Sequence, residues 1–103
     1  MSKDEPRTEC RTPNPDKPGT TRIPTWKFEL MKTHILAVVE EAGAEGVAFK
    51  ELSGLVGERL SDEVKAKLGS LGWHCTTVKL ELEVAGDISR LDGVSPQRIV
   101  LGS

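Results

Sequence analysis

The chain has 103 residues, of which 37% are hydrophobic and 29% are charged, and its formal net charge is −2. This size and composition are typical of one soluble globular domain, and no apolar run reaches the roughly 18 residues that a membrane span requires. The N-terminal residues MSKDEPRTEC contain no hydrophobic signal segment, so we expect a cytoplasmic protein that does not enter the membrane.

Residues 1–24 form a proline-rich segment whose only aliphatic residue is Ile23. The segment holds five of the six prolines, among threonine and charged residues. Because it can bury too little apolar surface to offset the entropy lost on ordering, we expect a disordered N-terminal arm. Such an arm is either a plain solvated tail or a tether that docks onto a partner. The sequence therefore predicts that the folded domain occupies residues 25–101.

Three main helices are predicted from apolar residues that recur every three or four positions. The first begins with Thr25 as its N-cap and ends at Gly43. A very short extended piece at residues 47–49 precedes the second, KELSGLVGERL. The segment SDEVKAKLGSLG, with Ser61 as an N-cap, then adds a short extra turn or two.

The stretch TTVKLELEVAGDISR, residues 76–90, fits two structures. In steps of two it alternates like a half-buried strand, but a wider window has apolar residues at helical spacings of 4, 3, 4 and 3. This second pattern explains more residues, and Gly86 is suited to close a helix, so we expect the third main helix here. The residues of the stripe are Leu71, Cys75, Val78, Leu82 and Ala85.

After Gly86 the segments DISRL, DGVSP and QRIVL have the character of a strand, a turn and a second strand. They predict a C-terminal β-hairpin. The order of elements is then helix, short strand, helix, helix and hairpin, which is an α+β fold.

This order, and LEVAGDISRL in particular, resembles the end of the recognition helix and the start of the wing in winged-helix proteins. The matching positions are Leu82, Glu83, Gly86, Ile88 and Arg90. The wider stretch from residue 26 to residue 100, with GWHCTTVKLELEVAG and SPQR, is similar to a family of uncharacterised small bacterial winged-helix-like proteins. The resemblance implies a winged helix-turn-helix-like domain with three main helices and a C-terminal β-hairpin wing.

The resemblance implies a small nucleic-acid-binding or transcription-associated module that places its recognition helix in the major groove of double-stranded DNA. Residues 64–80 contain basic residues and no acid, which agrees with this role. The acidic charge of the domain as a whole argues against it, because affinity for DNA comes largely from neutralising phosphates. The candidate contact residues are Lys65, Lys67, Ser70, His74, Thr76, Lys79, Arg90 and Arg98.

An alternative function follows from a second apolar line on the same helix, at spacings of 4, 3 and 4. It consists of Trp73, Thr77, Leu80 and Val84, with glutamates at its edges. A face that reads DNA should be polar or basic, whereas this one suits a homodimer or another protein partner. The hypothesis is a protein-interaction or dimerisation module of the same fold without DNA binding, with Trp73, Leu80 and Val84 as its interface. The structural alternative is that the hairpin and the tail cover these side chains.

Catalysis and metal binding find little support in the sequence. No nucleophile has an evident base and no glycine-rich phosphate loop is present, so we expect no enzyme, no cofactor and no small-molecule substrate. The order of Cys10, His34, His74 and Cys75 lacks the short paired spacings of a zinc site. We therefore expect no bound metal, reduced thiols, Cys10 in the tail and His34 at a helix surface.

Overall fold

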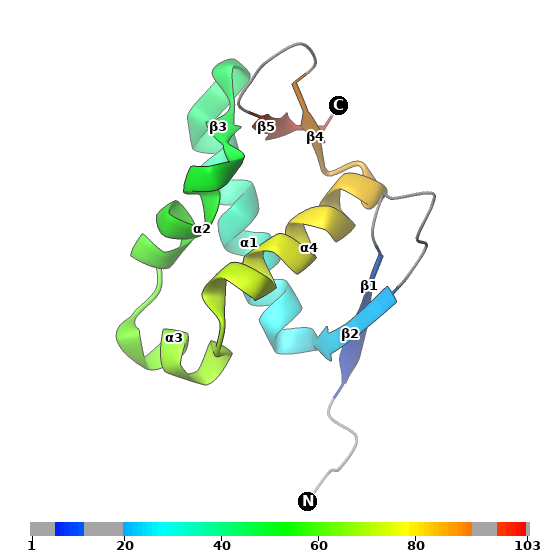
Figure 1. Ribbon diagram of the computed structural model, residues 1–103, viewed down its shortest axis with the longest axis vertical. Helices are drawn as coiled ribbons and strands as arrows, with labels where there is room; N and C mark the ends of the chain where they lie inside the picture. Colours follow the sequence, from blue (N-terminus) through cyan, green and yellow to red (C-terminus); the bar gives the residue numbers. More distant parts are fainter. Residues whose placement is uncertain (1–5, 12–19, 92–96, 103) are drawn as a thin grey trace, which may run out of the picture.

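The computed structural model describes residues 6–11, 20–91 and 97–102, and these form four α-helices and two small antiparallel sheets (Figure 1). The fold is α+β, as the sequence predicts. The elements in chain order are β1 (Arg7–Arg11), β2 (Thr20–Pro24), α1 (Thr25–Ala42), a 3-10 turn (Gly43–Glu45), β3 (Val47–Ala48), α2 (Phe49–Glu58), α3 (Asp62–Leu68), α4 (Leu71–Ala85), β4 (Ile88–Arg90) and β5 (Arg98–Leu101).

Helix α1 begins at Thr25, one residue before the start that Thr25 as N-cap would give. Pro24 holds the N-cap position and Thr25 is the first helical residue, so the prediction of Thr25 as N-cap is wrong. The N-terminal segment supplies the missing partners: the Thr25 N–H donates to the Pro6 carbonyl at 2.8 Å, and the Thr25 and Thr8 hydroxyls are 2.9 Å apart. The start of α1 is therefore satisfied by the neighbouring hairpin rather than by its own side chain.

Serine side chains cap the two helices that follow α2. Ser61 Oγ accepts from the N–H of Val64, which confirms the predicted cap and allows residues 62–68 to form a complete helix rather than an extra turn. This is why the described residues contain four helices instead of the predicted three. Ser70 Oγ accepts from the N–H of Trp73 and caps α4 in the same way.

Helix α4 settles the ambiguity of residues 76–84 in favour of a helix. It runs continuously to Ala85, and Gly86 adopts the left-handed conformation, with φ of 87°, that ends it. Cys75, Val78 and Leu82 of the predicted stripe are buried. Their burial reflects the position of α4, which crosses in front of α1 in the view of Figure 1 and packs on it.

An N-terminal hairpin replaces much of the predicted disordered arm. Strands β1 and β2 pair in antiparallel register, with Cys10 opposite Thr21, and Cys10 and Ile23 are 1% and 2% exposed. The prediction of disorder is therefore wrong for residues 7–11 and 20–24, and residues 1–5 and 12–19 of the predicted arm lie outside the described part. The two apolar side chains that the hairpin buries belong to the same core cluster as side chains of α1 and α4.

The second sheet has the strand order β3-β5-β4. Ile99 in β5 pairs with Val47 on one side and Arg90 on the other, so β5 joins β3, which lies between α1 and α2, to the strand that follows α4. The two strands predicted at the C-terminus are present and antiparallel, while the predicted turn DGVSP, residues 92–96, lies outside the described residues.

The core lies between α1, α2, α4 and the two sheets. Met31, Ile35 and Val39 of α1 are completely buried, and they belong to the same cluster as the buried stripe of α4 and the inward side chains of the strands. Among the described helices, none is long and apolar enough to cross a membrane.

Candidate functional site

The outer face of α4 carries an exposed apolar line. Trp73 is 48% exposed and Val84 is 37% exposed, while Leu80 between them is half-buried. Thr76 and Thr77 complete this face with uncharged side chains, the first exposed and the second half-buried. The alternative that the C-terminal hairpin and the tail cover Trp73 and Leu80 is therefore wrong for Trp73, while Leu80 is half-buried. Here we call Trp73, Thr77, Leu80 and Val84 the α4 outer line.

Lys79 lies on the inner side of α4, not on this face. It is 1% exposed, and its Nζ lies 2.5 Å from Glu83 Oε2, 3.1 Å from Gln97 Oε1 and 4.3 Å from the centre of the Phe49 ring. The interpretation of Lys79 as a base-contacting residue is wrong for this structure, because a buried ammonium cannot reach a DNA groove. It instead connects α4 to α2 and to Gln97, the residue before β5.

The two wing arginines predicted to contact DNA are also engaged within the chain. Arg90 Nε donates to Glu83 Oε1 at 2.6 Å. Arg98 Nε and Nη2 donate to the carbonyls of Glu45 and Gly46 at 2.8 and 3.0 Å. These bonds join the second sheet to α4 and to the 3-10 turn, and they engage Arg90 Nε and both Nε and Nη2 of Arg98 within the chain.

Ser70 and His74 belong to the start of α4. Besides the Ser70 cap, His74 Nδ1 lies 2.6 Å from the Ser70 carbonyl oxygen, and the imidazole is 8% exposed and meets the Trp73 ring edge-on at 4.9 Å. Among the predicted DNA residues, Lys67, Ser70, Thr76 and Arg90 are exposed and Lys65 and Arg98 are half-buried, whereas His74 and Lys79 are buried.

The predicted nucleic-acid residues do not form one cluster around α4. Figure 1 shows α3 beside the start of α4, whereas β4 follows its end. Because a helix rises about 1.5 Å per residue, the start of α4 beside α3 and its end before β4 are roughly 20 Å apart. The lysines of α3 thus lie at the opposite end of α4 from Arg90, with the uncharged α4 outer line between them.

An ion pair between Arg11 and Glu81 was not expected from the sequence. Arg11 Nη2 lies 2.6 Å from Glu81 Oε2, and the guanidinium holds the pKa of that carboxyl below its usual value, mainly through this side-chain hydrogen bond. The only signal in the sequence is a glutamate at the edge of the outer face, because Arg11 lies in the segment predicted to be a disordered arm. The pair fixes the hairpin to the flank of α4.

Both cysteines are free and buried, so the expectation of Cys10 in a solvated tail is wrong. Burial raises the pKa of each thiol to about 11; for Cys10 the Glu81 carboxylate adds to the rise. Because the thiolate is the reactive form, neither group is suited to nucleophilic chemistry. The described residues contain no group of three metal-ligating side chains.

Comparison with known proteins adds a family to this geometry. No curated protein and no solved structure matches the chain. A sequence model described as a family of unknown function (DUF6958) matches residues 7–99. The match starts with β1 and so includes the N-terminal hairpin as well as the helices and the second sheet. The chain belongs to this family of unknown function, DUF6958.

Proposed function

We propose that the protein is a non-enzymatic interaction module that forms a homodimer through the α4 outer line. The observation that carries the proposal is Trp73, an indole nearly half exposed on an uncharged helical face. Exposed aromatic residues on apolar faces are typical of protein interfaces. The order of helices and the antiparallel strands after α4 support a winged-helix-like arrangement, with α4 in the place of the recognition helix.

A second copy of the chain is the partner that the α4 outer line fits. The spacings between its residues, 4, 3 and 4, are the same from either end of the helix. Two antiparallel copies of α4 can therefore align their outer lines about a twofold axis. In that register Trp73 faces Val84 of the partner subunit and Leu80 faces Thr77 of the partner subunit. Each large side chain therefore meets a smaller one, as close packing between helices requires.

The charges beside the α4 outer line favour the same pairing. Glu83 is balanced by Lys79 and Arg90, and Glu81 by Arg11, within each chain. These internal ion pairs lower the repulsion that two acidic copies would otherwise experience at close range. The contact is then dominated by burial of apolar surface.

Light scattering coupled to size-exclusion chromatography tests the proposal. We expect the mass of a dimer for the wild-type chain and of a monomer for Val84→Glu, because the exposed position accepts a charge in the free chain but not in the interface. Leu101→Glu is the matched control: Leu101 is 44% exposed but lies in β5, so this variant should remain a dimer. A wild-type chain that stays monomeric at high concentration would disprove self-association.

Nucleic-acid binding is a second candidate function, favoured by the surface positions of Lys65 and Lys67 on α3 and of Thr76 on α4. We expect duplex DNA to bind at low salt, and Lys67→Glu to weaken binding more than Lys50→Glu, an exposed control on α2. Reversals at Lys79 or Arg98 are unsuitable, because they would remove contacts that hold the fold. Absence of binding at low salt would reject this candidate, since phosphate contacts are strongest there.

A further inference from the structure

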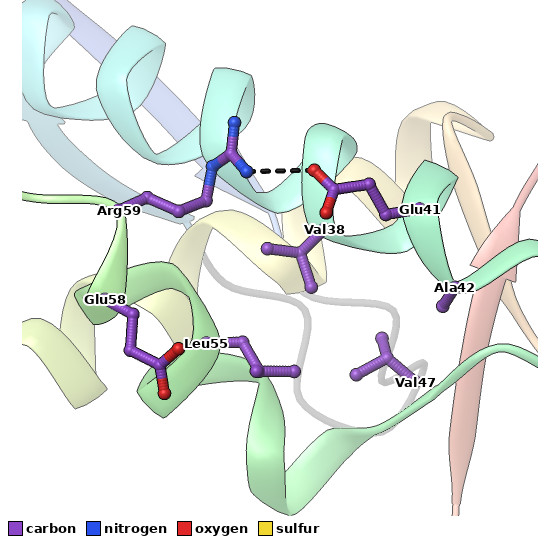
Figure 2. Close-up of a pocket in the computed structure, with 7 residues that line it drawn as sticks. All are labelled: Val38, Glu41, Ala42, Val47, Leu55, Glu58 and Arg59. Carbon is purple, nitrogen blue, oxygen red and sulfur yellow. Dashed lines mark hydrogen bonds and ion pairs between the residues drawn. The ribbon is translucent and has the colours of Figure 1, made fainter.

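A groove lies on the side of the molecule formed by the end of α1, by β3 and by α2 (Figure 2). Its volume is about 420 Å³. The apolar lining comes from Val38, Ala42, Val47 and Leu55, of which Leu55 is 37% exposed. No part of the α4 outer line lines the groove, so the two surfaces are separate.

The rim of the groove is acidic. Figure 2 shows Glu41 and Glu58 at its edge together with Arg59, whose Nη1 pairs with Glu41 Oε2 at 2.9 Å. Arg59 Nε also donates to His34 Nδ1 at 3.2 Å, so its guanidinium is held on the α1 side. Among the described residues Glu58 has no ion-pair partner, and the groove keeps a net negative charge.

The position of these acids is unfavourable for the helices themselves. Glu41 lies in the last turn of α1 and Glu58 is the last residue of α2, and neither last turn contains a basic residue. The C-terminal end of a helix carries partial negative charge, so glutamates there are disfavoured unless a cation is near. Arg59 supplies the nearby cation for Glu41. For Glu58, a cation from outside the chain would do the same.

We propose that this groove binds a basic amphipathic helix of a partner protein. Leucine-like side chains of such a helix would occupy the apolar lining, and a lysine or arginine beside them would pair with Glu58. A short apolar groove open at its rim suits the one-sided contact that a helix makes through residues at i, i+3, i+4 and i+7. The assignment rests on charge complementarity and does not depend on dimerisation through α4.

The test is a titration of isotope-labelled full-length protein, followed by NMR, with a synthetic helical peptide that has leucine at i, i+3, i+4 and i+7 and lysine elsewhere. We expect shifts centred on the methyl groups of Val38, Val47 and Leu55. Two control peptides accompany it, one with the same residues in scrambled order and one with glutamate in place of lysine. Both should bind much more weakly.

Charge reversal on α2 supplies the matched variants. Glu58→Lys should weaken binding about tenfold, the effect expected for removing an attractive charge pair and creating a repulsive one. Glu51→Lys changes the net charge equally, on an exposed position of the same helix that does not line the groove, and should have a small effect. Equal weakening by both variants, equal binding of the control peptides, or shifts centred away from the groove would overturn the proposal.

Discussion

Arg11 and Glu81 form three hydrogen bonds that join the end of β1 to the middle of α4. Arg11 Nε and its backbone N–H donate to Glu81 Oε1 at 2.9 and 2.8 Å, and Nη2 donates to Oε2 at 2.6 Å. The Glu81 side chain is 9% exposed and the Arg11 side chain is 50% exposed, so the carboxylate is sheltered from solvent while the guanidinium remains partly hydrated. Cys10, the residue before Arg11, is buried in the core.

Removal of this contact should open the hairpin before the rest of the fold. We expect Arg11→Ala to increase the rate at which iodoacetamide alkylates Cys10, while the rate for Cys75 in α4 stays unchanged. The reason is that detachment of β1 exposes only Cys10, whose thiol is otherwise buried. Mass spectrometry of the modified peptides reports the two rates separately.

Arg7→Ala is the control for this experiment, since Arg7 is an exposed residue of the same strand. It should leave both alkylation rates near those of the wild type. If Cys10 and Cys75 became reactive together in Arg11→Ala, the hairpin would not be a separately opening unit.

The pH dependence of stability should contain a contribution from Glu81. Arg11 lowers the pKa of Glu81 in the folded chain, so the stabilisation is complete above the ordinary value of 4.5 and is lost as the pH falls through the lower folded value. Urea unfolding at a series of pH values from neutral to strongly acidic should therefore show a flatter curve for Glu81→Gln than for the wild type. Parallel curves would show that the pair contributes nothing.

The repeated spacing along α4 was enough to predict a helix there. Its stripe of buried residues and its terminal glycine are local features, and local features can be predicted from the spacing and type of neighbouring residues. The N-terminal hairpin was not predictable in this way. Cys10 and Ile23 are too few to mark a folded segment, and their burial depends on surfaces that α1 and α4 provide from elsewhere in the chain.

In the candidate site too, features set by local spacing could be predicted and features set by distant contacts could not. Trp73 and Val84 are exposed because they lie opposite the buried stripe on a regular helix, whereas the sequence left open whether other segments would cover them. Lys79 was misplaced, because its burial requires Glu83, Gln97 and Phe49 to converge, and the last two come from other elements. A lysine is predicted at the surface unless its partners are known, since an unpaired buried charge is strongly disfavoured.

His34 should titrate below the usual range for histidine. Partial burial is the main cause of its lowered pKa, and the nearby Arg59 guanidinium adds to it. Since the folded pKa is below the ordinary 6.5, the folded chain takes up its proton later than the unfolded chain, and stability falls as the pH decreases from 6.5 toward the folded value. NMR titration of the imidazole should show a higher His34 pKa in Arg59→Met, and an unchanged one in the control Arg22→Met.

Two glycines should respond to alanine in opposite directions. Gly46 has φ of +74°, and a Cβ there would lie 2.7 Å from the Ile99 carbonyl oxygen in β5. Gly46→Ala should therefore lower the free energy of unfolding by about 1–3 kcal/mol, the range for backbone strain at such positions.

Gly54 lies inside α2 and has no atom within 4 Å of an added Cβ. Gly54→Ala should raise the free energy of unfolding by about 0.5–1 kcal/mol, because alanine loses less conformational entropy in a helix. Urea denaturation followed by circular dichroism measures both variants under the same conditions.

A Gly46→Ala chain as stable as the wild type would show that β3 does not hold its close approach to β5, and the second sheet would need a different register.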